Sequence, residues 1–313
     1  MVDICLLGCG GGMPMPFRSL SSTILNFKGR KILIDCGEGT QVSMKIAVTG
    51  FKDIDLICIT HCHGDHIVGL PGLLATIGNS GRIQPLTIIG PSGITEVVNG
   101  LRVIAKYLPY EINIIENPKE VKFDINKEKL ELSKENSQLI LSCLEVEHSS
   151  PCLGYSFYFK RDRKFSLEKA EENNVPKVLW NKFQKGNNEK IIYDGKTYKK
   201  EMVLGEERRG IKLSLITDTR PLKDIITFIK DSDLFICEGT YGDDADIEKA
   251  IKNKHMTFRE AALLAKEGKC KEMLLPHFSP SMIEPKEYEE NAKSIFENTI
   301  IGEDRMKKEL AFK

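Results

Sequence analysis

The chain has 313 residues, 41% of them hydrophobic, and its 45 Lys and Arg residues balance its 45 Asp and Glu residues. This length and composition are typical of a globular protein with one or two domains, and the zero net charge excludes a uniformly basic nucleic-acid binder. No apolar run approaches the roughly 20 residues that a membrane-spanning helix needs, and the first residues lack a secretory signal pattern. Because the nine cysteines include no CxxC pair, we expect mostly buried, reduced thiols in a cytoplasmic protein.

The chain opens with a predicted strand over residues 2–7, which leads into a glycine-rich loop over residues 8–14. A nucleotide-binding interpretation of this loop is weak, because Pro14 and Pro16 disfavour an immediate helix and no Walker lysine follows. We expect instead a tight loop whose backbone passes close to a functional site. Two further strands are predicted over residues 22–27 and 31–34.

The loop after residue 34 contains two carboxylates with two possible roles. Asp35 and Glu38 can accept the second ring N–H of metal-bound histidines, which usually bond to an oxygen. Alternatively, Glu38 and Thr40 begin a helix over residues 41–48. The sequence favours neither interpretation.

The most informative stretch follows the next predicted strand. Three of the six histidines of the chain fall between residues 61 and 66. His61 and His63 are spaced to bind one metal ion, and Asp65 and His66 are close enough in the loop to bind a second. Imidazole suits zinc and a carboxylate adds charge. A polar loop with incidental histidines is the alternative, and the clustering argues against it.

Short apolar strands later in the chain end repeatedly at polar residues. These residues are His148, Asp218, Glu238 and His277, and His255 lies in a loop before a helix predicted over 257–267. Strand ends on one edge of a sheet can face a common site, so we expect these side chains to meet. Other predicted strands cover residues 86–89, 112–115, 121–123, 139–146, 211–216, 234–237 and 273–275, and other helices cover 93–106, 222–230, 246–252 and 285–296.

Residues 160–200 differ in character from the rest of the chain. This segment holds twelve Lys and Arg against six Asp and Glu, so it carries a net charge of +6 and the remainder carries −6. It also contains Trp180, the only tryptophan. We interpret residues 160–205 as an inserted arm, either a footprint for a polyanion or a solvated surface insertion.

Several motifs, taken in order, resemble those of the ribonuclease Z family of the metallo-β-lactamase superfamily. They are HxHxDH at 61–66, GEGTQ at 37–41, GLPGLL at 69–74, TDTRP at 217–221, EGT at 238–240 and HMT at 255–257. The resemblance implies an α/β fold, a four-layer αββα sandwich formed by a single domain over residues 1–313 with the inserted arm. The chain departs from the family pattern at two places. A Gly-Pro-rich stretch is usual at residues 175–180, and an Arg-Tyr pair is common at Ser281 and Met282.

The resemblance also implies a site with two zinc ions. His61, His63 and His148 would bind the first ion, Asp65, His66 and His277 the second, and Asp218 would bridge both. Glu238 and His255 match a couple that the family uses in catalysis, and Asp65 would accept a proton. The same ligands also serve Mn²⁺ and Fe²⁺.

The implied activity is that of a zinc-dependent endoribonuclease, in which a metal-activated hydroxide removes the 3′ trailer from precursor tRNA and leaves a 3′-hydroxyl. Such enzymes are typically homodimers in which the arm of one subunit holds tRNA for the active site of the other. One alternative is a hydrolase of the same fold that acts on small phosphodiesters or sulfate esters. A second is a nucleic-acid-binding or scaffold protein with a structural metal site.

Overall fold

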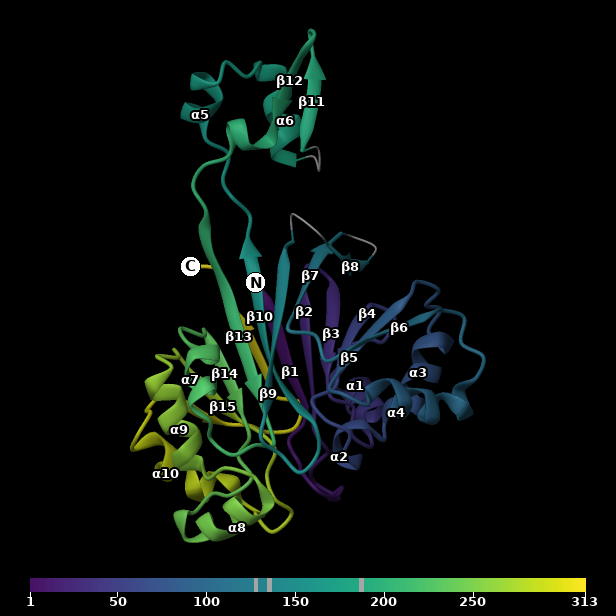
Figure 1. Cartoon of the computed structure of the whole chain (residues 1–313), viewed down its shortest axis with the longest axis vertical. Coiled ribbons are helices and arrows are strands. Elements are labelled where there is room, and N and C mark those ends of the chain that lie inside the picture. The colour runs from purple at the N-terminus through teal and green to yellow at the C-terminus, as the bar shows by residue number, and fades with distance from the viewer. Residues whose placement is uncertain (127–128, 134–136, 186–188) are drawn as a thin grey trace. The chain divides into compact units, whose positions relative to one another are not determined.

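The computed structural model describes residues 1–126, 129–133, 137–185 and 189–313 (Figure 1). The chain divides into two compact units, one formed by residues 1–159 and 211–313 and the other by residues 160–210. The larger unit contains two mixed β-sheets and most of the helices.

The first sheet has seven strands in the order β17-β1-β2-β3-β4-β5-β6. Their bounds are β1 Val2–Gly8, β2 Ser22–Phe27, β3 Arg30–Ile34, β4 Ile54–Cys58, β5 Leu86–Gly90, β6 Ile112–Glu116 and β17 Lys307–Leu310. Strands β3 to β6 pair in parallel, and the others pair antiparallel. Alternation decides which face each side chain joins: Ile32 and Ile34 belong to one buried cluster and Leu33 to the other.

The second sheet has eight strands in the order β16-β15-β14-β13-β10-β9-β7-β8. Their bounds are β7 Glu120–Ile125, β8 Leu130–Leu132, β9 Leu139–Val146, β10 Cys152–Arg161, β13 Arg208–Ile216, β14 Leu234–Cys237, β15 Met273–Leu275 and β16 Thr299–Ile301. Strands β13 to β16 pair in parallel, so the loops after β13, β14 and β15 emerge at one edge of the sheet.

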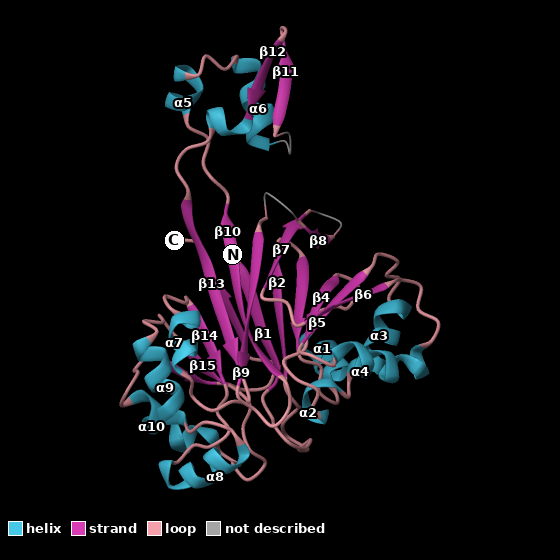
Figure 2. Cartoon of the chain, viewed as in Figure 1, coloured by secondary structure: helices cyan, strands magenta, loops and turns pink. Residues whose placement is uncertain are grey.

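Helices cover the outer face of each sheet, as Figure 2 shows. The helices α1 Thr40–Ala47, α3 Leu70–Asn79 and α4 Ile94–Leu101 pack on the first sheet. The helices α7 Lys223–Ile229, α9 Phe258–Glu267 and α10 Glu289–Lys293 share the large core cluster with the second. The predicted four-layer αββα sandwich is therefore confirmed. The remaining short helices of the larger unit are α2 Gly64–Ile67, η1 Arg102–Ala105, η3 Asp244–Asp246, α8 Ile247–Asn253 and η4 Pro285–Tyr288.

Two predicted helices are shorter than expected, and several strands were not predicted. The helix predicted over 93–106 ends at Leu101 and continues as a 3₁₀ turn, because Gly100 weakens its last turn. The helix predicted over 285–296 divides into η4 and a five-residue α10. Only Ala292 of α10 is buried, so little packing stabilises a longer helix. In the larger unit, the strands that the sequence did not predict include β8, β10 and β17.

The nine cysteines are all free thiols, and seven of them are buried. They match the mostly buried, reduced thiols expected from the sequence. Among the described residues, no helix is both long and apolar enough to cross a membrane.

The smaller unit, residues 160–210, has a core of its own. It contains α5 Leu167–Glu172, α6 Lys177–Lys185, the hairpin of β11 Lys190–Tyr193 and β12 Lys196–Lys199, and η2 Lys200–Val203. Its buried side chains are Ala170, Val175, Leu179, Phe183 and Val203. The indole N–H of Trp180 donates to the Val175 carbonyl at 2.8 Å, which holds the ring against this small core.

Candidate metal centre and active site

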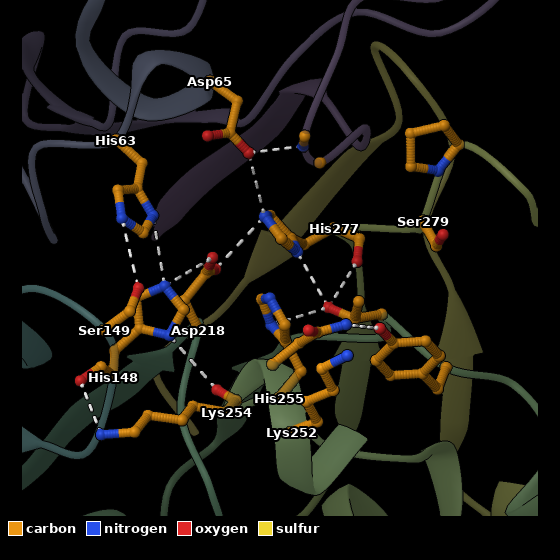
Figure 3. A pocket seen from close by; sticks show the side chains of 16 residues that line it. His63, Asp65, His148, Ser149, Asp218, Lys252, Lys254, His255, His277 and Ser279 are labelled. Atoms are coloured by element: carbon orange, nitrogen blue, oxygen red, sulfur yellow. Dashed lines mark hydrogen bonds and ion pairs between the residues drawn. The ribbon is translucent and has the colours of Figure 1, made fainter. Parts of the chain in front are cut away.

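The seven predicted ligands lie together where strands of the two sheets end. Figure 3 labels His63, Asp65, His148, Asp218 and His277 among them. The ligand atoms of all seven fall into two groups, each within 4.8 Å: His61, His63, His148 and Asp218 in one, and Asp65, His66 and His277 in the other. The structure therefore brings together residues that the sequence placed at the ends of separate strands.

Backbone geometry at these strand ends is strained where the polar residues begin. Three such residues lie within two positions of a strand end and have positive φ angles. They are Asp35 after β3 (+59°), Asp218 after β13 (+40°) and His277 after β15 (+63°). A non-glycine residue with positive φ is uncommon and costs of order 1–3 kcal/mol where the conformation is disfavoured. The surrounding hydrogen bonds hold these residues in place, and the turns direct their side chains into the site.

The rings of His66 and His277 are each fixed by an oxygen on one nitrogen. Nδ1 of His66 donates to the Asp35 carboxylate at 2.8 Å, and Nδ1 of His277 lies 3.0 Å from the Thr240 hydroxyl. Their Nε2 atoms then face each other at 3.1 Å. Because Nδ1 of His66 donates to the Asp35 carboxylate, it is Nε2 that would offer a lone pair to a metal ion once its proton is displaced.

The other three histidines converge in the same way. Nδ1 of His148 donates to the Lys254 carbonyl at 3.2 Å, and Nδ1 of His61 lies 3.1 Å from the Thr60 hydroxyl. Nδ1 of His63 then lies 3.0 Å from Nε2 of His61 and 3.2 Å from Nε2 of His148. A cluster of converging ring nitrogens is the arrangement expected of a metal site.

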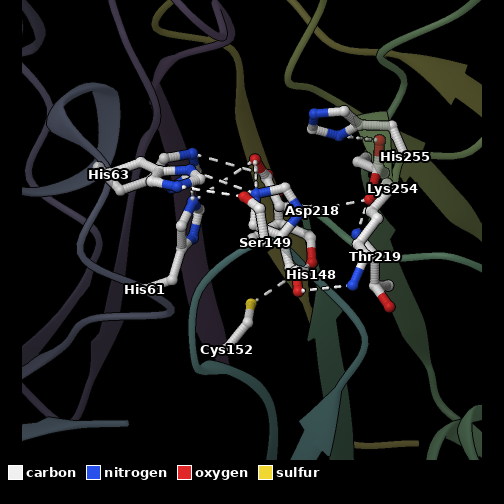
Figure 4. A network of polar contacts seen from close by, with 12 residues as sticks. His61, His63, His148, Ser149, Cys152, Asp218, Thr219, Lys254 and His255 are labelled. Atoms are coloured by element: carbon white, nitrogen blue, oxygen red, sulfur yellow. Dashed lines mark hydrogen bonds and ion pairs between the residues drawn. The ribbon is translucent and has the colours of Figure 1, made fainter. Parts of the chain in front are cut away.

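Asp218 lies between the two groups and presents one oxygen to each (Figure 4). Its Oδ1 is 3.6 Å from Nε2 of His66 and 3.2 Å from Nε2 of His277. Its Oδ2 is 3.6 Å from Nε2 of His61 and 3.8 Å from Nε2 of His148. This is the geometry that a carboxylate bridging two ions would need.

The ionisation of the cluster also suits a cation. Burial and the neighbouring His66 lower the pKa of His61 to about 2, and burial lowers the pKa of His148. Burial opposes the charge of Asp218, but the imidazoles around it outweigh this and hold its pKa well below the usual range. Burial lowers the pKa of His66, but the carboxylates of Asp218 and Asp35 outweigh this effect and raise that pKa. His61 and His148 are therefore neutral, whereas His66 would give up a proton when a metal ion binds, and the ionised carboxylates attract positive charge.

The glycine loop passes close to the site, as its sequence predicted. The amide of Gly12 donates to Asp65 Oδ2 at 2.6 Å. A Cβ on Gly11 would lie 2.5 Å from the His277 ring, so only glycine allows this approach. Burial raises the pKa of Asp65, but hydrogen bonds from His277 and His66 outweigh it and keep the carboxylate ionised.

The predicted couple of Glu238 and His255 lies beside the cluster. Nδ1 of His255 donates to Glu238 Oε2 at 2.9 Å, and Glu238 is fully buried. Three further donors fix this carboxylate: the Thr219 amide at 2.7 Å, the Thr240 hydroxyl at 2.6 Å and the Met256 amide at 3.2 Å. Burial lowers the pKa of His255, but the Glu238 carboxylate outweighs this effect and raises that pKa to about 9. His255 is thus protonated at neutral pH and can donate a proton.

The two alternatives for the loop at 35–41 each hold for one residue. Asp35 is the oxygen partner of His66 and also accepts from the amide of Thr60 at 2.7 Å. Glu38 is exposed, and α1 begins at Thr40 beside it. Asp35 therefore belongs to the site and Glu38 to the helix start.

Sequence reasoning did not single out several residues that orient the site. Thr60 and Thr240 stand next to predicted residues in their motifs, which is a usable signal. Arg220 donates to the carbonyl of His255 and forms an ion pair with Glu260 on α9. Lys254 contributes through its carbonyl, which every residue has, so no side-chain pattern could have indicated it.

A four-layer αββα sandwich with a His and Asp cluster at one edge defines the class of metallo-β-lactamase-fold proteins. The fold is similar to YhfI from Bacillus subtilis, a metallo-β-lactamase-fold protein, with a TM-score of 0.68 at 18% identity over 99% of this chain and 100% of that chain. It is also similar to human tRNase Z, short form, with a TM-score of 0.67 at 24% identity over 99% of both chains.

Sequence similarity extends over the whole chain. A relative named ribonuclease Z from Clostridium beijerinckii is 65% identical over 314 residues, which cover 100% of this chain and 99% of the relative. A family model described as "Anti-Pycsar protein Apyc1" matches residues 2–203. The chain belongs to the ribonuclease Z family, and residues 2–203 also place it in the sequence family of that model.

Proposed function

We propose that this chain removes the 3′ trailer from precursor tRNA and leaves a 3′-hydroxyl on the tRNA. Membership of the ribonuclease Z family gives the reaction class, since the chain is a metal-dependent endoribonuclease by that membership. The observation that carries the proposal is the cluster of imidazoles and carboxylates beside the Glu238–His255 couple. Such a pairing supplies both a cation site and a proton donor at one place.

Two zinc ions fit the donors of this cluster. His61, His63 and His148 would hold one ion, Asp65, His66 and His277 the other, and Asp218 both. Neutral imidazoles with a second nitrogen fixed by an oxygen are typical zinc ligands, and they serve Mn²⁺ and Fe²⁺ as well. When bound, such ions neutralise charge on the phosphate and lower the pKa of a water molecule toward 7.

The residues of the chain then manage the protons of hydrolysis. Asp65 takes the proton that the attacking water releases, because its carboxylate is ionised and held by Gly12. The water oxygen bonds to phosphorus and the P–O3′ bond breaks, since only that bond leaves a 3′-hydroxyl on the tRNA. His255 gives a proton to the departing O3′. Its Nδ1 is bonded to Glu238, so the proton comes from Nε2.

The arm at residues 160–205 would bind the body of the tRNA. Its excess of basic residues supports this role, since phosphate contacts from Lys and Arg supply most of non-specific affinity for nucleic acids. We extend the resemblance to a homodimer in which each arm serves the partner's site. The cytoplasmic location remains a prediction.

A cleavage assay tests the proposal. Purified protein would be incubated with a precursor tRNA that carries a 3′ trailer, beside a model phosphodiester, with and without a chelator. We expect chelator-sensitive cutting near the nucleotide that ends the tRNA, and the cut also locates the boundary relative to CCA. Hydrolysis of the small substrate alone would instead assign a small-phosphodiester hydrolase. Bound zinc without turnover of either substrate would favour a structural metal site.

A further inference from the structure

A cavity of about 430 Å³ opens beside the metal cluster, and one of its walls has no role in the chemistry described above. The cluster and the glycine loop form one wall. Tyr241, Lys252 and Asn253 line the other, and Figure 3 shows Lys252 near His255. Pockets that take small molecules measure roughly 300–1,000 Å³, so this cavity can hold a phosphate and a neighbouring nucleotide.

The aromatic ring on this wall is held in position. The side-chain amide of Asn253 donates to the Tyr241 hydroxyl at 2.7 Å. The backbone of Tyr241 donates to the Met256 carbonyl at 3.3 Å and accepts from the Phe258 amide at 2.9 Å. The ring centroids of Tyr241 and His255 lie 6.3 Å apart. The ring is therefore a rigid, partly exposed surface directly beside the proton donor.

Lys252 adds an available positive charge to the same wall. It is exposed, and among the described residues it has no hydrogen bond or ion pair. Its neighbours differ: the ammonium of Lys254 donates to the His148 carbonyl at 3.2 Å, and that of Lys249 pairs with Asp246 at 2.6 Å. A cationic side chain at a cavity that must admit an RNA strand can meet a phosphate.

We propose that Tyr241, Asn253 and Lys252 form the subsite for the nucleotide whose 3′ oxygen departs. The base of this nucleotide stacks on the ring of Tyr241, which Asn253 holds in place. Lys252 binds the phosphate on the 5′ side of the nucleotide. This placement rests on the proposed function, because the nucleotide that receives the proton of His255 must lie beside His255. Single-stranded RNA is commonly bound in this way, by bases stacked on aromatic side chains.

Tyr241→Leu tests the subsite, with Tyr241→Phe as the matched control that keeps the ring. Both would be assayed on a precursor tRNA and on the same RNA with an abasic ribose at the last position of the tRNA. Stacking of one base is worth roughly 5- to 150-fold, so Tyr241→Leu should lower kcat/KM on the intact RNA by about that factor. Tyr241→Phe keeps the stacking ring and loses only the hydrogen bond from Asn253, so it should lower kcat/KM much less than Tyr241→Leu. On the abasic RNA, kcat/KM of the wild type should fall by the same factor. Tyr241→Leu should lower it little further, because no base is left to stack.

Three results would overturn the subsite: equal loss by Tyr241→Leu on both RNAs, no loss on the intact RNA, or the same loss for Tyr241→Phe. Binding without turnover gives an independent measurement. Zinc-loaded wild type should bind adenosine 3′-monophosphate more tightly than ribose 3-phosphate, and Tyr241→Leu should remove the difference.

This binding comparison separates the subsite from the proposed function. A wild type that cuts no precursor tRNA but shows the base-dependent binding would refute only the function. A wild type that cuts precursor tRNA but binds both phosphates equally would refute only the subsite. If Tyr241→Leu fails to fold, Lys252→Met replaces it. Lys252→Met should weaken binding of a dinucleotide 3′-monophosphate, which adds the phosphate on the 5′ side, and leave binding of adenosine 3′-monophosphate unaffected. Equal weakening of both would overturn the role of Lys252.

Discussion

The sandwich edge that carries the site and the arm at residues 160–210 use charge in opposite ways. At the edge, His61, His66 and Asp218 are buried and each is fixed by hydrogen bonds or ion pairs. In the arm, basic side chains are exposed: Lys164, Lys177, Lys182, Lys190, Lys196 and Lys199. Buried, preorganised groups suit a reaction at one phosphorus atom, whereas exposed cations suit loose binding of a polyanion. Changes at the edge should therefore affect every substrate, and changes in the arm only large ones.

The largest effect is expected from Asp218→Ala. Its two oxygens face both groups of imidazoles, so the variant should lose metal from both and hydrolyse neither precursor tRNA nor a small phosphodiester. Metal content by elemental analysis and both activities would be measured together. A variant that retains two zinc ions per chain would refute the bridging role.

His255→Ala should leave metal content unchanged and still slow the reaction. Loss of a proton donor typically costs about 10²–10⁴-fold, and the loss should appear in kcat on both substrates. His255 is in contact with Glu238 and lies outside the two groups assigned to zinc, although its ring nitrogen also falls within 4.8 Å of ligand atoms of Asp218 and His277. Loss of zinc in parallel with activity would show that His255 holds metal instead.

The contrast between these two variants shows what a sequence can reveal. The sequence singled out all seven residues of the cluster and the Glu238–His255 couple, partly because ionisable residues at the ends of apolar strands are visible in one chain. Their roles came from the resemblance to the ribonuclease Z family. The orienting contacts were not, because they use a hydroxyl, as in Thr60, or a carbonyl, as in Lys254. The four layers were implied by the resemblance to the ribonuclease Z family, whereas the ends of α4 and α10 depend on packing that a local pattern does not contain.

Glu238→Gln should change the pH dependence and reduce activity by about 10- to 100-fold, as the loss of an orienting partner typically does. The Glu238 carboxylate raises the pKa of His255 to about 9. A proton donor is active below its pKa and inactive above it, so activity should fall as pH rises through that value. Without the carboxylate the pKa of His255 falls, and the high-pH limb of kcat should move to lower pH. If the high-pH limb of kcat does not move in Glu238→Gln, that limb reports the titration of another group.

Replacing residues 165–200 by a short Gly-Ser linker should affect precursor tRNA alone. KM for the tRNA should rise, and the slope of log(kcat/KM) against log salt concentration should shrink by about 0.9 for each phosphate that the shortened protein no longer neutralises. Hydrolysis of a small phosphodiester should match the wild type. Equal losses on both substrates would indicate that the sandwich itself was damaged.

The smallest effect on chemistry is expected from a matched pair of core substitutions, Phe183→Ala in the arm and Phe235→Ala in the sandwich. Both phenylalanines are fully buried, and each truncation costs about 3–5 kcal/mol. Five side chains form the buried core of the described part of the arm, so Phe183→Ala should unfold the arm locally. It should then mimic the deletion, with higher KM for tRNA and an unchanged main thermal transition. Phe235→Ala should instead lower the main transition and leave KM for tRNA near wild type. A single transition lowered equally by both substitutions would show that the arm and the sandwich unfold as one unit, and that the contrast between them does not extend to stability.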